Sequence, residues 1–512
     1  MFTLTGGRYL NIKILFVLAV IIFAVYGKSL FFDFVYFDDD ILILDKQNYL
    51  KISNIKNILS DPVFARENDK YYRPVLNLSF LADSLVYKTN PSGYHLTNIL
   101  IHLFAVFSVF LLLSYKHDKS LALLFAAVFA VHPALVKAVA WIPGRNDSLL
   151  ALFAVLSFYF FINYCEKEKL KDFIFSISFF TLAMFTKETA VITLPLFIIY
   201  LILKKLNFKK HISIITILSV ITCIFFIIRH FVFSYQTVNP SFSVFFNSAL
   251  KNMPVILKYM QMIIFPVDLS VIVSKIEINY FIFSYTLFLF LLLFFLSEKN
   301  KNSVKVNIFC IIWFILYLLP ACLVPNNNYD THRIYLPMAG IFLFFIESTE
   351  IFYLSKKRLI GTFIILLLII FCSISYIQTD KFKNKKVFWI NALLDNQQSA
   401  VANANVAGLL SDAGKFNEAE NKYLKAISIE PWESKHYVNL AVLYIKKNNI
   451  NLSEKYLLTA LKLNPLNEMA YYNLAVIYRY QGKKDQAFEM KNKYLEVFKI
   501  QNRYDKPSEI KL

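Results

Sequence analysis

The sequence is poor in cysteine, glycine and charge. Its five cysteines lie in or at the ends of apolar segments and have no metal-type spacing, which argues against a disulfide framework and against a thiolate ligand set. Only 10 of the 512 residues are glycine and 17% are charged, whereas 57% are hydrophobic and 52 are phenylalanine. A soluble core of this length could not hide so much apolar surface. The composition, with a mean hydropathy of +0.51, predicts a polytopic membrane protein.

The positive charge is gathered in short clusters between apolar runs. The formal net charge of +19 could suggest a nucleic-acid partner, but the positive-inside rule explains the placement better, and we expect no nucleic acid to bind. Five alternate loops on the side of the N-terminus carry such clusters, at 116–119, 167–171, 204–210, 299–305 and 356–358. The opposite short loops hold only four cations, Lys137, Arg145, Lys187 and Arg333.

About eleven apolar spans are expected. The first, residues 10–32, lacks a clean small-x-small cleavage site and indicates an uncleaved anchor with a cytoplasmic N-terminus. The others lie at about 94–114, 119–133, 148–164, 172–186, 188–203, 211–233, 278–296, 305–324, 334–353 and 358–378. This count places the first loop, 33–93, and everything after residue 380 on the same extracytoplasmic side.

The segment after the last span is soluble and repetitive. A 34-residue period aligns Pro431 with Pro465, Ala407 with Ala441 and Ala475, and Leu440 with Leu474. Small residues at helix crossings and a proline closing the second helix are typical of tetratricopeptide repeats. About three such repeats, forming an α-solenoid, are expected over 399–505. Their concave face would bind an extended acceptor peptide, although a spacer or an oligomerisation element would give the same pattern.

Three consecutive carboxylates, Asp38, Asp39 and Asp40, follow the first span. In an arbitrary chain such a triplet is a solvated turn or a helix start, because aspartate is favoured at both. At the mouth of a membrane segment it could instead accept a proton or bind a cation.

Polar residues within apolar surroundings recur at one depth, toward the outer leaflet. Each one alone would indicate snorkelling at the interface or an internal ion pair. Together below an acidic loop they suit a lipid-phosphate headgroup. They include His95, His132, Arg145, Asp147, Lys187, Glu188, Arg229 and Arg333, and the motifs given next add Arg73 and Tyr335 as candidates.

Several short motifs follow one another along the chain in an order that resembles a known family. They are Phe-Asp-Asp-Asp at 37–40, Tyr-Arg-Pro-Val at 72–75, Asn-Pro-Ser-Gly-Tyr-His-Leu-Thr-Asn at 90–98, His-Pro at 132–133, Ala-Trp-Ile-Pro-Gly-Arg-Asn-Asp at 140–147, Lys-Glu-Thr-Ala at 187–190 and Arg-Ile-Tyr-Leu-Pro at 333–337. With the terminal repeats, the chain resembles the transmembrane and tetratricopeptide-repeat O-mannosyltransferases and their bacterial relatives, within the GT-C glycosyltransferases.

The resemblance implies an all-α, polytopic GT-C-type domain at 1–379, a linker helix at 380–398 and the repeats. It also implies a polyprenyl-phosphate sugar donor and a first-loop acid as catalytic base. The paired acids fall on Asp38 and Asp39, with Asp40 as an extra candidate; Asp39 is slightly favoured as the base. We expect an inverting transfer to a hydroxyl of protein Ser or Thr, with the cations above stabilising the departing phosphate.

Two positions depart from the family pattern. Lys137 and His332 stand where relatives commonly have an acid, which leaves the sugar and the charge balance of the site open. No metal or other cofactor is expected, although Mg²⁺ or Mn²⁺ at Asp38–Asp40 is conceivable. An O-antigen ligase or polymerase, or a non-enzymatic membrane scaffold, are the alternatives. We favour a bacterial inner membrane with periplasmic repeats; in a eukaryote the repeats would lie in the lumen of the endoplasmic reticulum.

Overall fold

The computed structural model describes residues 3–64, 71–233, 242–275, 277–297, 301–323 and 328–501. It divides into two compact units. The first comprises residues 1–44, 50–63 and 70–383, and the second comprises 45–49, 64–69 and 384–512. Both are built from helices, as predicted, and the described residues add only one two-residue antiparallel strand pair, β1 (Ser274–Lys275) and β2 (Asn328–Tyr329).

The first unit holds sixteen α-helices among the described residues. They are α1 (Thr3–Tyr26), α2 (Ile55–Ser60), α3 (Pro74–Tyr87), α4 (Pro91–Leu113), α5 (Lys119–Ala130), α6 (Val136–Ala140), α7 (Arg145–Lys167), α8 (Leu170–Thr186), α9 (Thr193–Leu203), α10 (Phe208–Phe233), α11 (Phe242–Asn252), α12 (Pro254–Ile264), α13 (Tyr280–Ser297), α14 (Lys301–Cys322), α15 (Tyr335–Ser355) and α16 (Lys357–Thr379). Short helical turns join them: η1 (Gly27–Phe31), η2 (Asp40–Leu44), η3 (Ile52–Asn54), η4 (Pro133–Leu135), η5 (Ile142–Gly144), η6 (Glu188–Ile192), η7 (Thr331–Ile334) and η8 (Asp380–Phe382).

Six helical segments in the described part of the chain are long and apolar enough to cross a membrane. They are Asn11–Phe31, Pro91–Leu113, Ile142–Lys167, Phe208–Phe233, Ser303–Cys322 and Lys357–Phe382. A bent pair from Lys119 to Ala140 would make a seventh, and Glu188–Leu203 and Tyr280–Phe295 are shorter apolar helices. The chain is an integral membrane protein, as predicted. Every expected span coincides with a helix, but the count of eleven is not confirmed.

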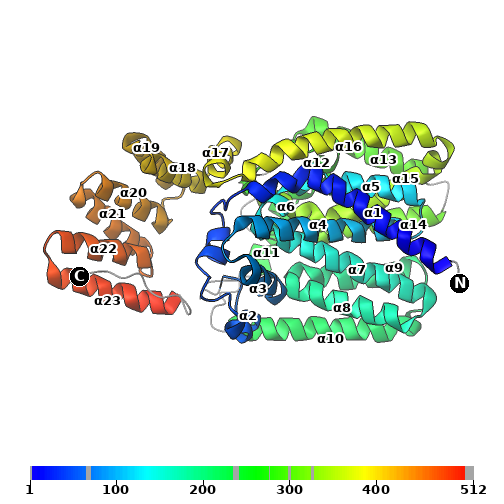
Figure 1. Cartoon of the computed structure of the whole chain (residues 1–512), viewed down its shortest axis with the longest axis horizontal. Coiled ribbons are helices and arrows are strands. Elements are labelled where there is room, and N and C mark those ends of the chain that lie inside the picture. The colour runs from blue at the N-terminus through cyan, green and yellow to red at the C-terminus, as the bar shows by residue number, and fades with distance from the viewer. Residues whose placement is uncertain are drawn as a thin grey trace. The chain divides into compact units, whose positions relative to one another are not determined.

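The helices that position the site pack side by side. α4 packs against α7, α7 against α8, and α8 against α10, and these four lie next to one another in Figure 1. α4 begins sharply because Pro91 occupies its first turn and the Asn90 side chain accepts the Ser92 N–H. The expected span at 119–133 ends at His132-Pro133, where the chain bends by 52° into η4 and α6. This break turns residues 136–144 back along the end of the bundle.

The second unit consists of α17 (Lys385–Asp395) followed by three helix pairs. These are α18 (Ala400–Asp412) with α19 (Phe416–Ile429), α20 (Ser434–Lys446) with α21 (Ile450–Leu463), and α22 (Glu468–Tyr480) with α23 (Lys484–Gln501). Each pair turns at a residue with left-handed backbone, at the same point of the 34-residue period: Gly414 (φ 76°), Asn448 (φ 58°) and Gly482 (φ 76°). Glycine and asparagine adopt this conformation at the lowest cost.

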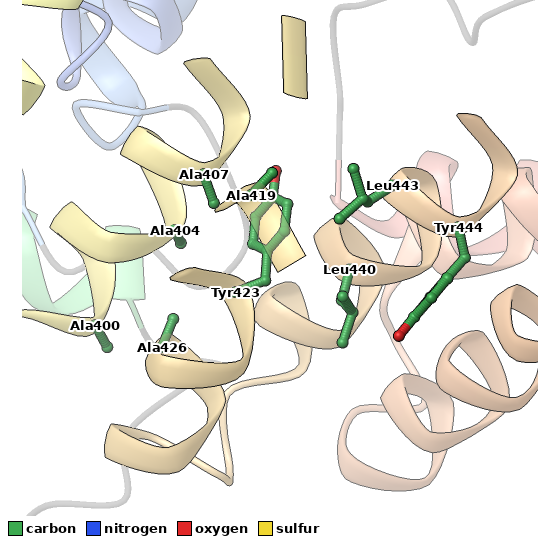
Figure 2. Packing of buried hydrophobic residues seen from close by; sticks show 9 residues of the cluster. All are labelled: Ala400, Ala404, Ala407, Ala419, Tyr423, Ala426, Leu440, Leu443 and Tyr444. Carbon is green, nitrogen blue, oxygen red and sulfur yellow. The ribbon is translucent and has the colours of Figure 1, made fainter. Parts of the chain in front are cut away.

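Small side chains form the crossings between these helices. Ala407, Ala419 and Ala426 are fully buried in a cluster with Tyr423 and Tyr444, as Figure 2 shows. A hydrogen bond repeats with the period: the Tyr444 hydroxyl donates to Glu420 (2.6 Å), and the Tyr478 hydroxyl donates to Glu454 (2.9 Å). The repeats predicted from the alanine pattern are therefore formed.

Candidate active site

Asp39 organises the acidic loop through its own carboxylate. Oδ2 accepts the Val35 N–H (2.8 Å), and Oδ1 accepts the N–H groups of Phe37 (2.9 Å) and Asp40 (3.1 Å). The bonds hold a turn in which Tyr36 (φ 59°) and Asp38 (φ 70°) both have left-handed backbone, which is uncommon for non-glycine residues. Asp39 is buried, and burial raises its pKa to about 7 although the three N–H donors oppose this shift.

The neighbouring acids have different surroundings. Asp38 and Asp40 are half-buried, and the Asp38 carbonyl accepts the Leu42 N–H (2.8 Å), which continues the chain into η2. Oδ1 of Asp40 is shielded from solvent and has no hydrogen-bond partner in the part of the chain that the structure describes. The triplet is therefore not three equivalent solvated carboxylates.

Trp141 ties this loop to the bundle. Its indole N–H donates to the Phe37 carbonyl (2.8 Å), and its ring stacks on the Phe37 ring with 5.2 Å between centroids. The Lys137 ammonium lies over both rings, 5.6 Å from the Phe37 centroid and 5.1 Å from that of Trp141. Gly144 permits this packing, because a Cβ there would lie 2.6 Å from the Lys137 carbonyl oxygen. The acidic loop thus lies directly beside Lys137.

A buried chain of ionisable side chains, called the charged chain below, extends from Lys137. Its ammonium is 2.7 Å from Asp330 Oδ1, and His332 Nδ1 is 2.8 Å from the same oxygen. His332 Nε2 is 3.7 Å from Asp147 Oδ2, and Asp147 Oδ1 is 2.7 Å from the Lys187 ammonium. Burial alone would raise the pKa of Asp330, but His332 and Lys137 outweigh it and hold that pKa well below its usual range. Asp330 is therefore ionised.

Arg73 and Glu188 form a second, bidentate pair next to this chain. The Arg73 Nε donates to Glu188 Oε2 (3.0 Å), and its terminal nitrogen donates to Oε1 (2.7 Å). Arg73 also interacts electrostatically with Asp147, which places the pair beside Lys187. The two groups together bring four predicted site residues into one place: Arg73, Asp147, Lys187 and Glu188.

Arg333 differs from the other cations of the site. It follows His332 in η7, is half-buried, and acts electrostatically on Asp330 and Tyr259. In the described residues its guanidinium makes no ion pair or hydrogen bond. The charged chain and the Arg73 pair hold three cations and three carboxylates, so Arg333 is a further positive charge beside these balanced pairs.

Arg145 lies in the interior of the protein, where its guanidinium is already hydrogen-bonded. It is fully buried, and its guanidinium donates to Asn98 Oδ1 (2.7 Å), Asp83 Oδ2 (2.5 Å) and the Tyr94 carbonyl (3.0 Å). Asn98 in turn donates to the carbonyls of Val139, Trp141 and Ile142. This network joins α3, α4 and the turn before α7. Phosphate binding by Arg145 stays a prediction and would require these bonds to open.

The predicted histidines and Tyr335 are also enclosed. His132 Nε2 lies 2.9 Å from the Ile263 carbonyl, and its Nδ1 accepts the Ala134 N–H (3.2 Å). The Tyr335 hydroxyl lies 2.6 Å from His102 Nδ1, and the buried His95 ring packs edge-on against Phe32. Arg229, near the end of α10, stacks on Phe233 (5.2 Å), and no contact of its side chain with the charged chain is seen among the described residues. Their roles in the donor site stay predictions.

Sequence reasoning missed Asp83 and Asp330 as partners of the cations. Asp83 follows Leu76 and Phe80 at helical spacing on the buried face of α3, so a carboxylate on an apolar face was its signal. Asp330 could have been found by asking which acid at the same depth neutralises Lys137.

Comparison with known proteins connects this geometry with a family. Residues 84–232 match the model of the dolichyl-phosphate-mannose-protein mannosyltransferases. Residues 435–465 and 456–489 match models of the tetratricopeptide repeat. The family resemblance seen in the motifs is confirmed. The mannosyltransferase match includes α4, α7 and η6. Arg145 and Asp147 lie in α7, and Glu188 lies in η6.

Individual relatives agree with this result. The chain is 23% identical over 455 residues to the protein O-mannosyl-transferase F38B6.6 of Caenorhabditis elegans, covering 83% of the chain and 64% of the relative. It is 31% identical over 156 residues to human protein O-mannosyl-transferase TMTC3, covering 29% of the chain and 17% of the relative. A Drosophila melanogaster protein O-mannosyl-transferase, Tmtc1, is 31% identical over 180 residues, 34% of the chain and 21% of its own length. The chain thus spans less than two thirds of each of these relatives.

Proposed function

We propose that the protein is a membrane glycosyltransferase that transfers a mannose-like sugar from a polyprenyl-phosphate donor to a Ser or Thr hydroxyl of an acceptor protein. The observation that carries the proposal is the acidic loop, held by Trp141 against a buried charged chain that has Arg333 next to it in sequence. In an inverting transfer the acceptor oxygen attacks the anomeric carbon and loses its proton to a carboxylate. The bond from the sugar to the lipid phosphate breaks, and the phosphate leaves with its negative charge.

Asp38 is our candidate for the base. Both oxygens of Asp39 already accept backbone N–H groups, so Asp39 is better suited to shape the loop. Asp38 is half-buried on left-handed backbone that its neighbours hold in place, as functional loops often are. Asp40 is the second candidate, since one of its oxygens has no hydrogen-bond partner among the described residues.

Arg333 and Asp147 are our candidates for binding the donor. The Arg333 guanidinium can stabilise the lipid phosphate as its charge grows. Oδ2 of Asp147 is buried without a hydrogen-bond partner in the described chain, so it can accept a hydrogen bond from a sugar hydroxyl. Lys187 and Arg73 hold their carboxylates in place around this position.

The test uses purified full-length protein, a polyprenyl-phosphate mannose and a Ser/Thr acceptor peptide. We expect Asp38→Asn to lower kcat at least about 100-fold and Asp40→Asn to lower it only slightly. Asp33→Asn is the matched control, because Asp33 is an exposed acid of the same loop. Full activity of D38N would reject Asp38 as the base, and full activity of all three variants of the triplet would reject the acidic loop.

The donor site is tested separately through KM. Arg333→Gln should raise the KM for the donor about 10-fold to 100-fold, as expected for loss of a charge-assisted hydrogen bond. Arg358→Gln is the matched control, because Arg358 is an exposed arginine in the first turn of α16 and is not a predicted site residue. No transfer by the wild type from several polyprenyl-phosphate sugars would favour a membrane scaffold over an enzyme.

We further propose that transfer needs no divalent metal and that the repeats bind the acceptor on the extracytoplasmic side, in a bacterial periplasm or an endoplasmic-reticulum lumen. Activity that is lost in EDTA and restored by Mn²⁺ would contradict the first point. A reporter fused after Leu512 tests the second, because cytoplasmic reporter activity would overturn the predicted orientation.

A further inference from the structure

A second polar cluster lies at the opposite ends of the helices that carry the site. α7 begins at Arg145 and runs for 23 residues, about 34 Å at 1.5 Å per residue, before it ends at Lys167. α4 and α9 likewise run from the site to this end, where Lys116 and Lys204 follow them. A pocket with a cavity volume of about 70 Å³ opens here. It is therefore separate from the candidate active site.

The floor of this pocket is aromatic. Phe158, Tyr200 and Phe309 line it, and their rings contact one another, with centroid distances of 5.2 Å (Phe158–Phe309), 5.5 Å (Phe158–Tyr200) and 5.9 Å (Tyr200–Phe309). Ile162 and Leu343 complete the apolar wall. A small soluble anion would gain nothing from such a surface, whereas a hydrocarbon chain would.

Three lysines, Lys116, Lys204 and Lys305, line the same pocket. Lys116 is paired with Glu166 (2.6 Å). Lys204 and Lys305 are half-buried, and within the described ranges neither has a carboxylate within ion-pair distance. Burial, followed by the charge of Lys116, lowers the pKa of Lys204, while Glu347 and Glu166 oppose the shift and Lys305 adds to it. The ammonium groups are therefore close enough to repel one another. An anion bound between them would relieve this repulsion.

The acids at this end are already used. His117 Nδ1 is 2.6 Å from Glu350, its Nε2 is 3.4 Å from Glu347, and Glu350 also accepts the Asp118 N–H (2.6 Å). Glu166 accepts from Tyr115 (2.6 Å) as well as from Lys116. Glu347 and His117 also line the pocket. Lys204 and Lys305 therefore face a mostly apolar cavity whose carboxylate, Glu347, is shared with His117.

From this arrangement we propose that the pocket binds an anionic phospholipid of the adjacent leaflet, with its phosphate between Lys204 and Lys305 and the first carbons of an acyl chain on the aromatic floor. The positive-inside distribution assigns this end to the cytoplasm, where the leaflet is rich in anionic lipid. The inference does not depend on the proposed sugar transfer.

The test measures lipid binding to the delipidated full-length protein by native mass spectrometry, with phosphatidylglycerol, phosphatidylcholine and inorganic phosphate as probes. We expect phosphatidylglycerol to bind more tightly than phosphatidylcholine, and millimolar phosphate not to displace it. The K204Q/K305Q variant should bind phosphatidylglycerol roughly 30-fold more weakly, since two lysine contacts are lost. K204R/K305R, which keeps both charges, should bind nearly as the wild type does.

The control is K169Q/K171Q, which removes two exposed lysines from the same end of the bundle. If it weakens binding as much as K204Q/K305Q, the attraction belongs to the general surface charge and the proposal fails. Unchanged binding by K204Q/K305Q, equal binding of phosphatidylcholine, or displacement by inorganic phosphate would each overturn it too. Should the double variant not be monodisperse, K305Q alone should weaken binding about 5-fold, and no weakening would overturn the site.

Discussion

Removing one member of the Lys137–Asp330 pair should cost far more stability than removing both. The side chains are 2% and 7% exposed, and their charged atoms are 2.7 Å apart. At an effective dielectric constant of 20 this distance corresponds to about 6 kcal/mol of Coulomb attraction, most of which offsets the cost of burying the two charges. Truncation of a single partner leaves the other charge buried and uncompensated, at about 3–5 kcal/mol.

The two truncations should differ in size. Lys137→Ala leaves Asp330 beside His332, which can take up a proton, so we expect the lower end, about 3 kcal/mol. Asp330→Ala leaves Lys137 with the Phe37 and Trp141 rings as its side-chain contacts among the described residues, so we expect about 5 kcal/mol. The double variant should cost less than the sum of the two, by a coupling of about 2–3 kcal/mol.

The assay is the free energy of unfolding of the full chain in bicelles titrated with SDS. Lys28–Asp380 provides a matched cycle, since its atoms are also 2.7 Å apart but its carboxylate side chain is 55% exposed. Its coupling should stay below about 1 kcal/mol. Additive costs in the Lys137–Asp330 cycle, or equal couplings in the two cycles, would refute the account of a buried compensated pair.

Three further predictions concern the loop, the interior arginine and the repeats. Asp39 has a pKa near 7 in the folded protein and a lower one in the unfolded chain, so the stability it contributes is fully present below about pH 4 and is lost as the pH rises through 7. Relative to Asp39→Asn, the free energy of unfolding of the wild type should fall by about 1.4 kcal/mol between pH 6 and pH 8. Unfolding at both pH values measures this difference, and an equal change in the two proteins would contradict the prediction. Arg145→Lys should destabilise the membrane unit by about 3 kcal/mol, because lysine cannot make all three of the hydrogen bonds that the Arg145 guanidinium donates. Lys171→Arg on the exposed surface is the control and should leave the free energy of unfolding unchanged. Asn448→Ala should lower the opening free energy of α20 and α21, measured by hydrogen exchange, by about 1 kcal/mol, whereas Asn448→Gly should not. Equal protection in the two variants would show that alanine adopts the left-handed turn at no cost.

Much of the architecture could be predicted because it depends on local pattern. The 34-residue alanine period gave the repeats, and the apolar runs gave helices at every expected span. Arg73, Asp147, Lys187 and Glu188 could be expected at one depth because the helix ends that carry them fall on the same side of the predicted topology. Their grouping follows from chain direction alone.

The pairing of charges could not be predicted in this way. Arg145 meets Asp83 across 62 residues and Lys137 meets Asp330 across 193, and no local propensity selects one distant carboxylate over another. The role of Asp39 was hidden for a different reason. It depends on two non-glycine residues, Tyr36 and Asp38, in left-handed backbone, a conformation that the sequence alone disfavours.

Lys137 and His332 each replace an acid that the family pattern leads one to expect, and this left the charge balance of the site open. The structure shows that the exchange is compensated within the site. Asp330 supplies a carboxylate 2.7 Å from Lys137, and burial lowers the pKa of His332 despite the nearby Asp330 and Asp147, so the ring adds little charge near neutral pH. The charged chain is then neutral, and Arg333 is a further positive charge beside it. These two departures therefore do not count against the anionic donor that we propose.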